Sequence, residues 1–112
     1  MDLVVKSRGV TVDGRLHDLA LHKLERLTRL ERRVQRVEIE VIAERHRPEG
    51  HRRLEAALTI PRKTFRAHAE GPDVEHTLDR IVQRLERQLR DHHGKLRAKH
   101  KGATGNRLES AG

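Results

Sequence analysis

The chain has 112 residues, which is enough for one domain with a modest core but leaves little room for a second. Lysine and arginine total 25 against 17 aspartate and glutamate residues, and the net charge of +8 favours a polyanionic partner, either nucleic acid or an anionic membrane surface. There is no cysteine, which excludes disulfides and thiol chemistry, and there is no signal peptide or apolar run near the ~20 residues of a membrane span, so we expect a soluble cytoplasmic protein.

The first two predicted elements are a strand and a helix. Residues 2–8 (DLVVKSR) are rich in β-branched side chains and are followed by Gly9, which is typical of a short strand. Asp13 can accept hydrogen bonds from the backbone of the next turn, as the residue that caps a helix does. Apolar residues then recur at helical spacing, so we expect an amphipathic helix over roughly 14–31. They are Leu16, Leu19, Ala20, Leu24, Leu27 and Leu30.

The middle of the chain predicts three consecutive antiparallel strands. Apolar residues recur there at every second position, which indicates strands buried on one face and charged on the other. Pro48 and Gly50 in the segment HRPEGH predict a turn between the first two of these strands, and Pro61 begins a tight connection to the third. The three strands are expected at about residues 34–44, 54–60 and 64–70.

A second helix is expected to follow Gly71. Pro72 fits the first turn of a helix because its missing N–H is not needed there, and Asp73 suits the positive end of the helix dipole. A leucine-rich stripe continues to about Lys99, where we expect the helix to end. Residues 102–112 are small or polar and bury too little to offset the entropy of ordering them, so they are expected to be a disordered tail.

The predicted order is therefore β-α-β-β-β-α. This pattern is typical of an α+β fold in which a four-stranded sheet has both helices packed on one face. We expect a single domain over residues 1–101 followed by the tail.

The second helix carries most of the excess positive charge. Between Arg80 and Lys101 there are eight cations against only Glu86 and Asp91. A charge run is usually a solvated face balanced by acids, but this excess favours binding to a polyanion. Phe65 is the single aromatic residue, so contacts to phosphates and to shape are expected rather than base stacking. At about 100° per residue, one stripe holds Arg80, Arg84, Arg87 and Lys95.

Lys23 lies close to the apolar stripe of the first helix. Its ammonium group cannot end in the core, but its stem can cover apolar surface while the charge emerges between the two helices. That position would add a cation to the groove between the helices. A lysine at the edge of the stripe can equally reach water without any function, and the sequence leaves both interpretations open.

Three segments together resemble a known family. They are DGRLHDLALHKLERL (13–27), VEIEV (37–41) and LDRIVQRLERQLRDH (78–92). In this order they resemble the ribosome hibernation promoting factor and ribosome-associated translation inhibitor family, over about residues 2–97. The resemblance implies the fold derived above and a place on the small ribosomal subunit, in the channel for mRNA and tRNA anticodon ends, where the protein blocks translation.

The resemblance also implies which residues contact ribosomal RNA. Carried over by position, these are Lys23, Arg26, Arg84, Arg87 and Arg90, and the next candidates are Arg80 and Lys95. His22 stands where the family often has another lysine. Long members continue into a second domain that pairs ribosomes, so this chain resembles the short form or a first domain. The sequence leaves open whether ribosomes stay single or form dimers.

Other classes of function are less well supported. No nucleophile with its base, phosphate-binding glycine loop or H-E-x-x-H motif occurs, so no enzyme, cofactor or small-molecule substrate is expected. His92 and His93 would point about 100° apart on a helix, while His46 and His51 flank a turn, so no metal site is expected either. The main alternative is a stand-alone module for double-stranded RNA, and a purely protein-binding module is a third class; DNA is not an expected partner.

Overall fold

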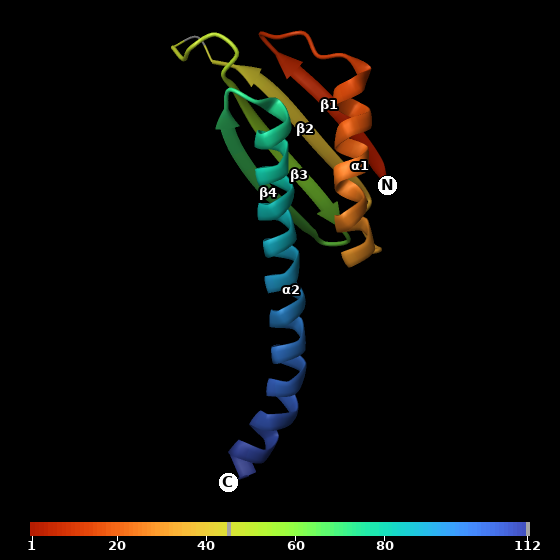
Figure 1. The fold of residues 1–112 in the computed structure, drawn as a ribbon. Helices are drawn as coiled ribbons and strands as arrows, with labels where there is room; N and C mark the ends of the chain where they lie inside the picture. The colour runs from red at the N-terminus through yellow and green to blue at the C-terminus, as the bar shows by residue number, and fades with distance from the viewer. Residues whose placement is uncertain (45, 112) are drawn as a thin grey trace.

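The computed structural model describes the backbone of residues 1–44 and 46–111, and the side chains of residues 1–44 and 46–98. Its elements follow the predicted order β-α-β-β-β-α and form a sheet with two helices (Figure 1). Their bounds are β1 Asp2–Arg8, α1 Gly14–Leu30, β2 Arg36–Ala43, β3 Arg52–Ile60, β4 Lys63–Gly71 and α2 Val74–Ala111. Among the described residues, neither helix contains an apolar stretch of the length that a membrane span needs.

The sheet has the strand order β1-β2-β3-β4, with β1 and β2 parallel and the other pairs antiparallel. The register brings apolar side chains together across the strands, because Leu58 of β3 lies opposite Val37 of β2 and Phe65 of β4. The turn between β3 and β4 is tight and holds Arg62 in the left-handed region, at φ 69°. The three antiparallel strands predicted from the alternating pattern are therefore confirmed.

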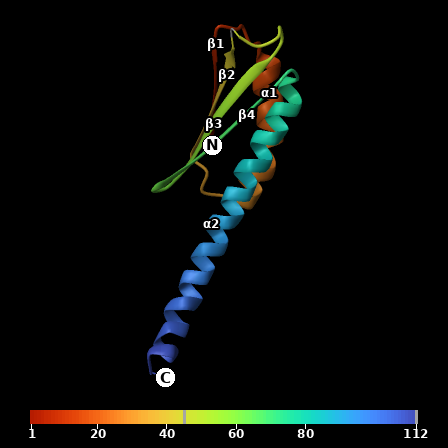
Figure 2. The ribbon, with the colours of Figure 1, turned by 90° about the vertical axis from the view of Figure 1, so that its left-hand side faces the viewer.

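Both helices cover the same face of the sheet, as Figure 2 shows. One core forms between them and the inward side chains of the strands, and it is aliphatic apart from Phe65. The opposite face is open to solvent and carries cross-strand ion pairs such as Arg8 Nη2 to Glu40 Oε1 at 2.7 Å. The largest fully buried side chains are Leu24, Leu27, Ile39, Leu54, Leu58, Ile60, Leu78, Ile81, Leu85, Leu89, Val37 and Val41.

The two helix starts have side-chain caps. Asp13 Oδ1 accepts from the backbone N–H of Arg15, and Asp73 Oδ1 accepts from the N–H groups of Glu75 and His76. Pro72 therefore precedes the helix instead of lying in its first turn. The helix α2 continues past Lys99, where the sequence predicted its end, and extends beyond the sheet (Figures 1 and 2). The division into a domain and a tail at residue 102 stays a prediction, since the side chains from residue 99 onward lie outside the described ones.

Candidate nucleic-acid interface

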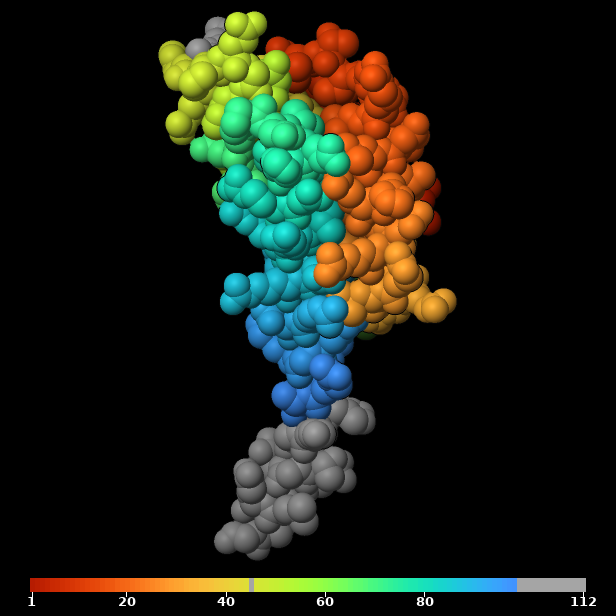
Figure 3. Space-filling view, viewed as in Figure 1, coloured from red at the N-terminus to blue at the C-terminus, as the bar shows by residue number. Residues whose placement is uncertain are grey.

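The helices α1 and α2 lie side by side on one face of the molecule (Figure 3). Two adjoining hollows run along the line between them, and the side chains of both helices line these hollows. We call this surface the interhelix groove. It is lined by His22, Lys23, Glu25, Arg26, Arg29, Leu30, Asp79, Val82, Gln83, Glu86 and Arg90.

Lys23 occupies the end of the groove nearest the start of α2. Its ammonium group does emerge between the helices, as one of the two interpretations expected, but it is held there by acids of α2. Lys23 Nζ donates to Asp79 Oδ1 at 2.5 Å and lies 3.6 Å from Glu75 Oε1, and its side chain is only 17% exposed. This charge joins α1 to α2, which leaves it less available for RNA than the position alone suggested.

The same contact makes a prediction about alkaline pH. The hydrogen bond to Asp79 raises the pKa of Lys23 above its ordinary 10.5, against the opposing effect of burial. A raised folded-state pKa means that the pair stabilises the fold below pH 10.5 and that this contribution fades as the pH rises through the folded-state value. Lys23→Met should therefore lower the free energy of unfolding by about 1 kcal/mol at neutral pH, and by less at about pH 11.5.

Urea unfolding of wild type and Lys23→Met at both pH values measures this difference. The sequence has no tyrosine or cysteine, so neither a phenol nor a thiol loses a proton between the two pH values. A difference that stays constant with pH would show that altered packing, and not the missing charge, explains the variant.

The other end of the groove is basic. Glu86 of α2 forms ion pairs with two arginines, because its Oε1 lies 2.9 Å from Arg26 Nε and 3.6 Å from Arg90 Nη2. The carboxylate is largely covered, with 16% of its side chain exposed, whereas the Arg26 and Arg90 side chains are 63% and 64% exposed. Arg29 lines the same hollow and pairs only loosely, at 4.0 Å, with Glu25. One covered carboxylate thus holds two exposed guanidinium groups in place, and a third lies beside them.

Two of the other predicted arginines face the edge of the sheet. Arg80 Nη1 donates to the carbonyl oxygen of Glu70 at 3.0 Å, and Arg84 Nη1 donates to that of His68. Gln88 Nε2, one turn further along α2, donates to the carbonyl oxygen of Arg66 at 2.7 Å. These carbonyls belong to β4, the edge strand, whose outer backbone groups have no neighbouring strand. We call Arg80, Arg84 and Gln88 the edge clamp, because they satisfy three alternate carbonyls of this strand.

Arg87 and Lys95 are the least constrained of the predicted residues. Both side chains are exposed, and neither forms an ion pair or hydrogen bond within residues 1–44 and 46–98. Lys95 lines a separate hollow beside β4, together with Lys63 and His92. The His92 ring packs edge-on against Phe65, with 5.3 Å between the ring centres. The stripe predicted on α2 is therefore divided among the β4 edge, the outer face and this hollow, whereas Arg90 faces the groove.

Sequence reasoning missed the acids that position these cations. The charge pattern indicates Glu86 only as partial balance for the arginines, and it does not single out Glu31. Glu31 is buried at the end of α1, where Arg33 Nε donates to it at 2.7 Å and His93 Nε2 of α2 lies 3.5 Å away. One sequence feature could have indicated the acids of α2, because Glu75, Asp79 and Glu86 recur on its flank at helical spacing. Their partners on α1 cannot be assigned without knowing how the two helices pack.

Comparison with known proteins agrees with this architecture. A ribosomal subunit interface protein from Coxiella burnetii has a similar structure, with a TM-score of 0.74 and 23% identity over 84% of this chain and 99% of that one. The N-terminal domain of Protein Y from Thermus thermophilus matches with a TM-score of 0.70 and 22% identity, over 82% and 99% of the two chains. No curated protein matches at a significant level. Residues 3–97 match the model of the sigma 54 modulation protein / S30EA ribosomal protein family, and the chain therefore belongs to that family.

Proposed function

We propose that the protein holds ribosomes inactive by binding the small ribosomal subunit, with the interhelix groove against ribosomal RNA in the channel for mRNA and tRNA. The name of the family refers to a ribosomal protein, and one structural neighbour is a ribosomal subunit interface protein. Both observations support association with the ribosome. The observation that carries the RNA contact is the group of exposed arginines around Glu86. Such binding needs no catalytic group or cofactor, and it requires a cytoplasmic location.

The chemistry of these side chains suits a phosphate backbone. A guanidinium group is always charged and offers planar, paired donors that match phosphate oxygens. Arg26 and Arg90 keep donors free beyond their contact to Glu86, because each guanidinium has five N–H groups. Arg87 adds a charge on the outer face of α2. Binding that neutralises phosphates releases counterions, so affinity should fall steeply with salt.

Co-sedimentation with separated ribosomal subunits tests the proposal. We expect the protein to pellet with the small subunit and not with the large one, and to do so less at higher salt. Binding to the large subunit alone, or to neither subunit, would contradict the proposal.

A second experiment tests the channel. Small subunits preloaded with mRNA and initiator tRNA should bind the protein much more weakly than empty subunits if the same space is occupied. Equal binding to loaded and empty subunits would place the protein elsewhere on the particle.

The alternative of a stand-alone duplex-RNA module makes a different prediction. Modules of that kind recognise the shape of about 16 base pairs of A-form RNA. They would bind a free duplex of that length as tightly as they bind the small subunit. Neither the family nor the structural neighbours support this alternative, and a direct comparison of the two affinities decides between them.

A further inference from the structure

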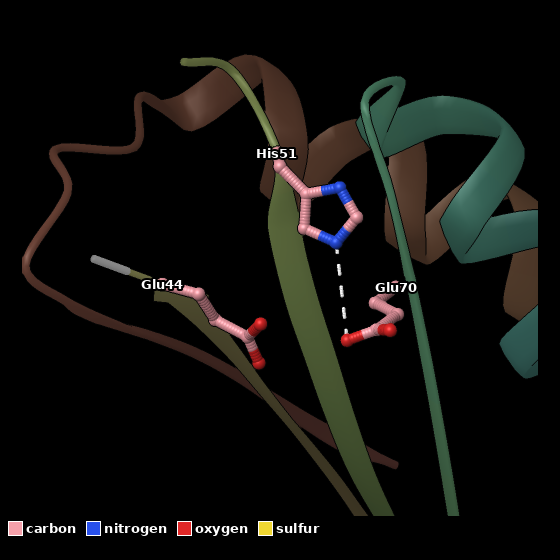
Figure 4. Close-up of side chains that lie close together, drawn as sticks. All are labelled: Glu44, His51 and Glu70. Carbon is pink, nitrogen blue, oxygen red and sulfur yellow. Dashed lines mark ion pairs between the residues drawn. The ribbon is translucent and has the colours of Figure 1, made fainter. Parts of the chain in front are cut away.

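Three side chains with metal-binding atoms meet at one end of the sheet. Glu44 directly follows β2, His51 directly precedes β3, and Glu70 lies near the end of β4 (Figure 4). One ligand atom from each residue can be chosen so that all three lie within 4.8 Å of one another. The next residue after Glu70, Gly71, is buried toward the helices, so this cluster lies on the open face, opposite the interhelix groove.

The imidazole of His51 has a ring nitrogen without a hydrogen-bond partner. Its Nε2 atom is buried and has no hydrogen-bond partner among the described residues. The nearest acid oxygen, Glu70 Oε2, lies 3.8 Å away, which is too far for a hydrogen bond. A buried polar atom without a hydrogen-bond partner is unfavourable and calls for a ligand or a water molecule. Figure 4 shows this nitrogen pointing toward Glu70.

The two carboxylates already face a positive charge. Arg47, in the turn between β2 and β3, has Nε 3.6 Å from Glu44 Oε2 and Nη2 3.4 Å from Glu70 Oε1. Both distances are long for an arginine pair, and the arginine side chain is 52% exposed. Neither of these contacts reaches the imidazole, so Arg47 neutralises the carboxylates but leaves His51 Nε2 without a hydrogen-bond partner among the described residues.

We propose that Glu44, His51 and Glu70 bind a divalent transition-metal ion of the zinc class. An imidazole nitrogen with two carboxylate oxygens is a donor set that such ions accept, whereas magnesium and calcium prefer oxygen alone. Ligands about 2.0–2.2 Å from a tetrahedral ion lie roughly 3.4 Å apart, so small side-chain rotations close the present spacing. The ion displaces Arg47 and ties the β2–β3 turn to β4. Remaining positions on the ion are filled by water.

The sequence predicts no metal site, because His92 and His93 would point apart on a helix, His46 and His51 flank a turn, and no short metal-ligand motif occurs. The ligands are separated by 7 residues (44 to 51) and by 19 residues (51 to 70), and only the pairing of β2, β3 and β4 brings them together.

Titration of the full chain with zinc chloride, followed by calorimetry and by thermal unfolding, tests the site. Wild type should bind one ion per chain and should melt at a higher temperature with zinc. His51→Gln and Glu44→Gln should each weaken the affinity by at least about 10-fold, whereas His76→Gln, a change at an exposed histidine on α2, should leave it unchanged. Magnesium chloride should not bind.

Arg47→Ala keeps the proposal testable even if a ligand variant unfolds. Removing the competing cation should tighten zinc binding, because the two carboxylates then have no other partner in the cluster. Loss of zinc binding in Arg47→Ala, absence of a one-to-one complex in wild type, or equal affinity in His51→Gln would each overturn the site. Since the readout is metal binding by the isolated protein, none of these outcomes depends on the ribosome.

Discussion

Arg87→Glu combined with Arg90→Glu is expected to weaken binding to the small ribosomal subunit by roughly 10- to 100-fold at moderate salt. These residues hold exposed charges on the outer face of α2 and at the basic end of the interhelix groove. Each phosphate that a cation neutralises adds about 0.7–0.9 to the slope of log affinity against log salt, so removing two such cations should lower the slope by about 1.4–1.8. Co-sedimentation across a salt series measures both quantities.

A matched control separates a local interaction from total charge. Lys6→Glu combined with Arg66→Glu changes the net charge equally, but both residues lie in the sheet, where Lys6 pairs with Glu38 on the open face. This variant should retain most of the affinity. An equal loss in both double variants would mean that long-range attraction, and not contact by α2, drives binding. Thermal unfolding should confirm that Arg90→Glu, now beside Glu86, remains folded.

The edge clamp leads to the second large expected effect, which is on stability. Arg80→Ala, Arg84→Ala and Gln88→Ala together remove three hydrogen bonds from α2 to the backbone of β4. At a net value of about 0.5–1.5 kcal/mol for each bond, the free energy of unfolding should fall by roughly 1.5–4.5 kcal/mol. The uncovered edge of β4 should also pair with other chains. Urea unfolding and sedimentation velocity measure the two consequences.

A control on the same helix uses Gln83→Ala, Arg87→Ala and Arg97→Ala. These side chains are exposed and form no hydrogen bond within the described side chains, so stability should change by less than about 0.5 kcal/mol and the chain should stay monodisperse. Alanine is itself the best helix former, so equal destabilisation of both triple variants would mean that a general loss of side-chain contacts along α2, and not the clamp, is responsible.

These two experiments also assign different roles to arginines that the sequence grouped together. Arg80 and Arg84 are expected to act mainly on the fold, because β4 already takes part of their hydrogen-bonding capacity. Arg87 and Arg90 are expected to act mainly on binding. A variant such as Arg84→Glu would mix the two effects, so it is a poor probe of RNA contact by itself.

The fold was predictable because it rests on local patterns. Alternation along β3 from Leu54 to Ile60 and the helical spacing of Leu24 and Leu27 are set by which face of each element must be buried. Asp13 caps α1 as predicted, since the capping interaction spans only two residues. The end of α2 was less predictable, because a helix that leaves the sheet is no longer limited by burial.

By itself the sequence determined the α+β architecture, the aliphatic core and the basic character of α2. Only the tertiary structure decided what each charge does: Lys23 reaches Asp79 across 56 positions, Arg26 shares Glu86 with Arg90, and Arg84 reaches β4. The cluster of Glu44, His51 and Glu70 likewise exists only in the folded sheet. The physical reason is that burial patterns are periodic along the chain, whereas a charge selects its partner by distance in space, which depends on how finished elements pack.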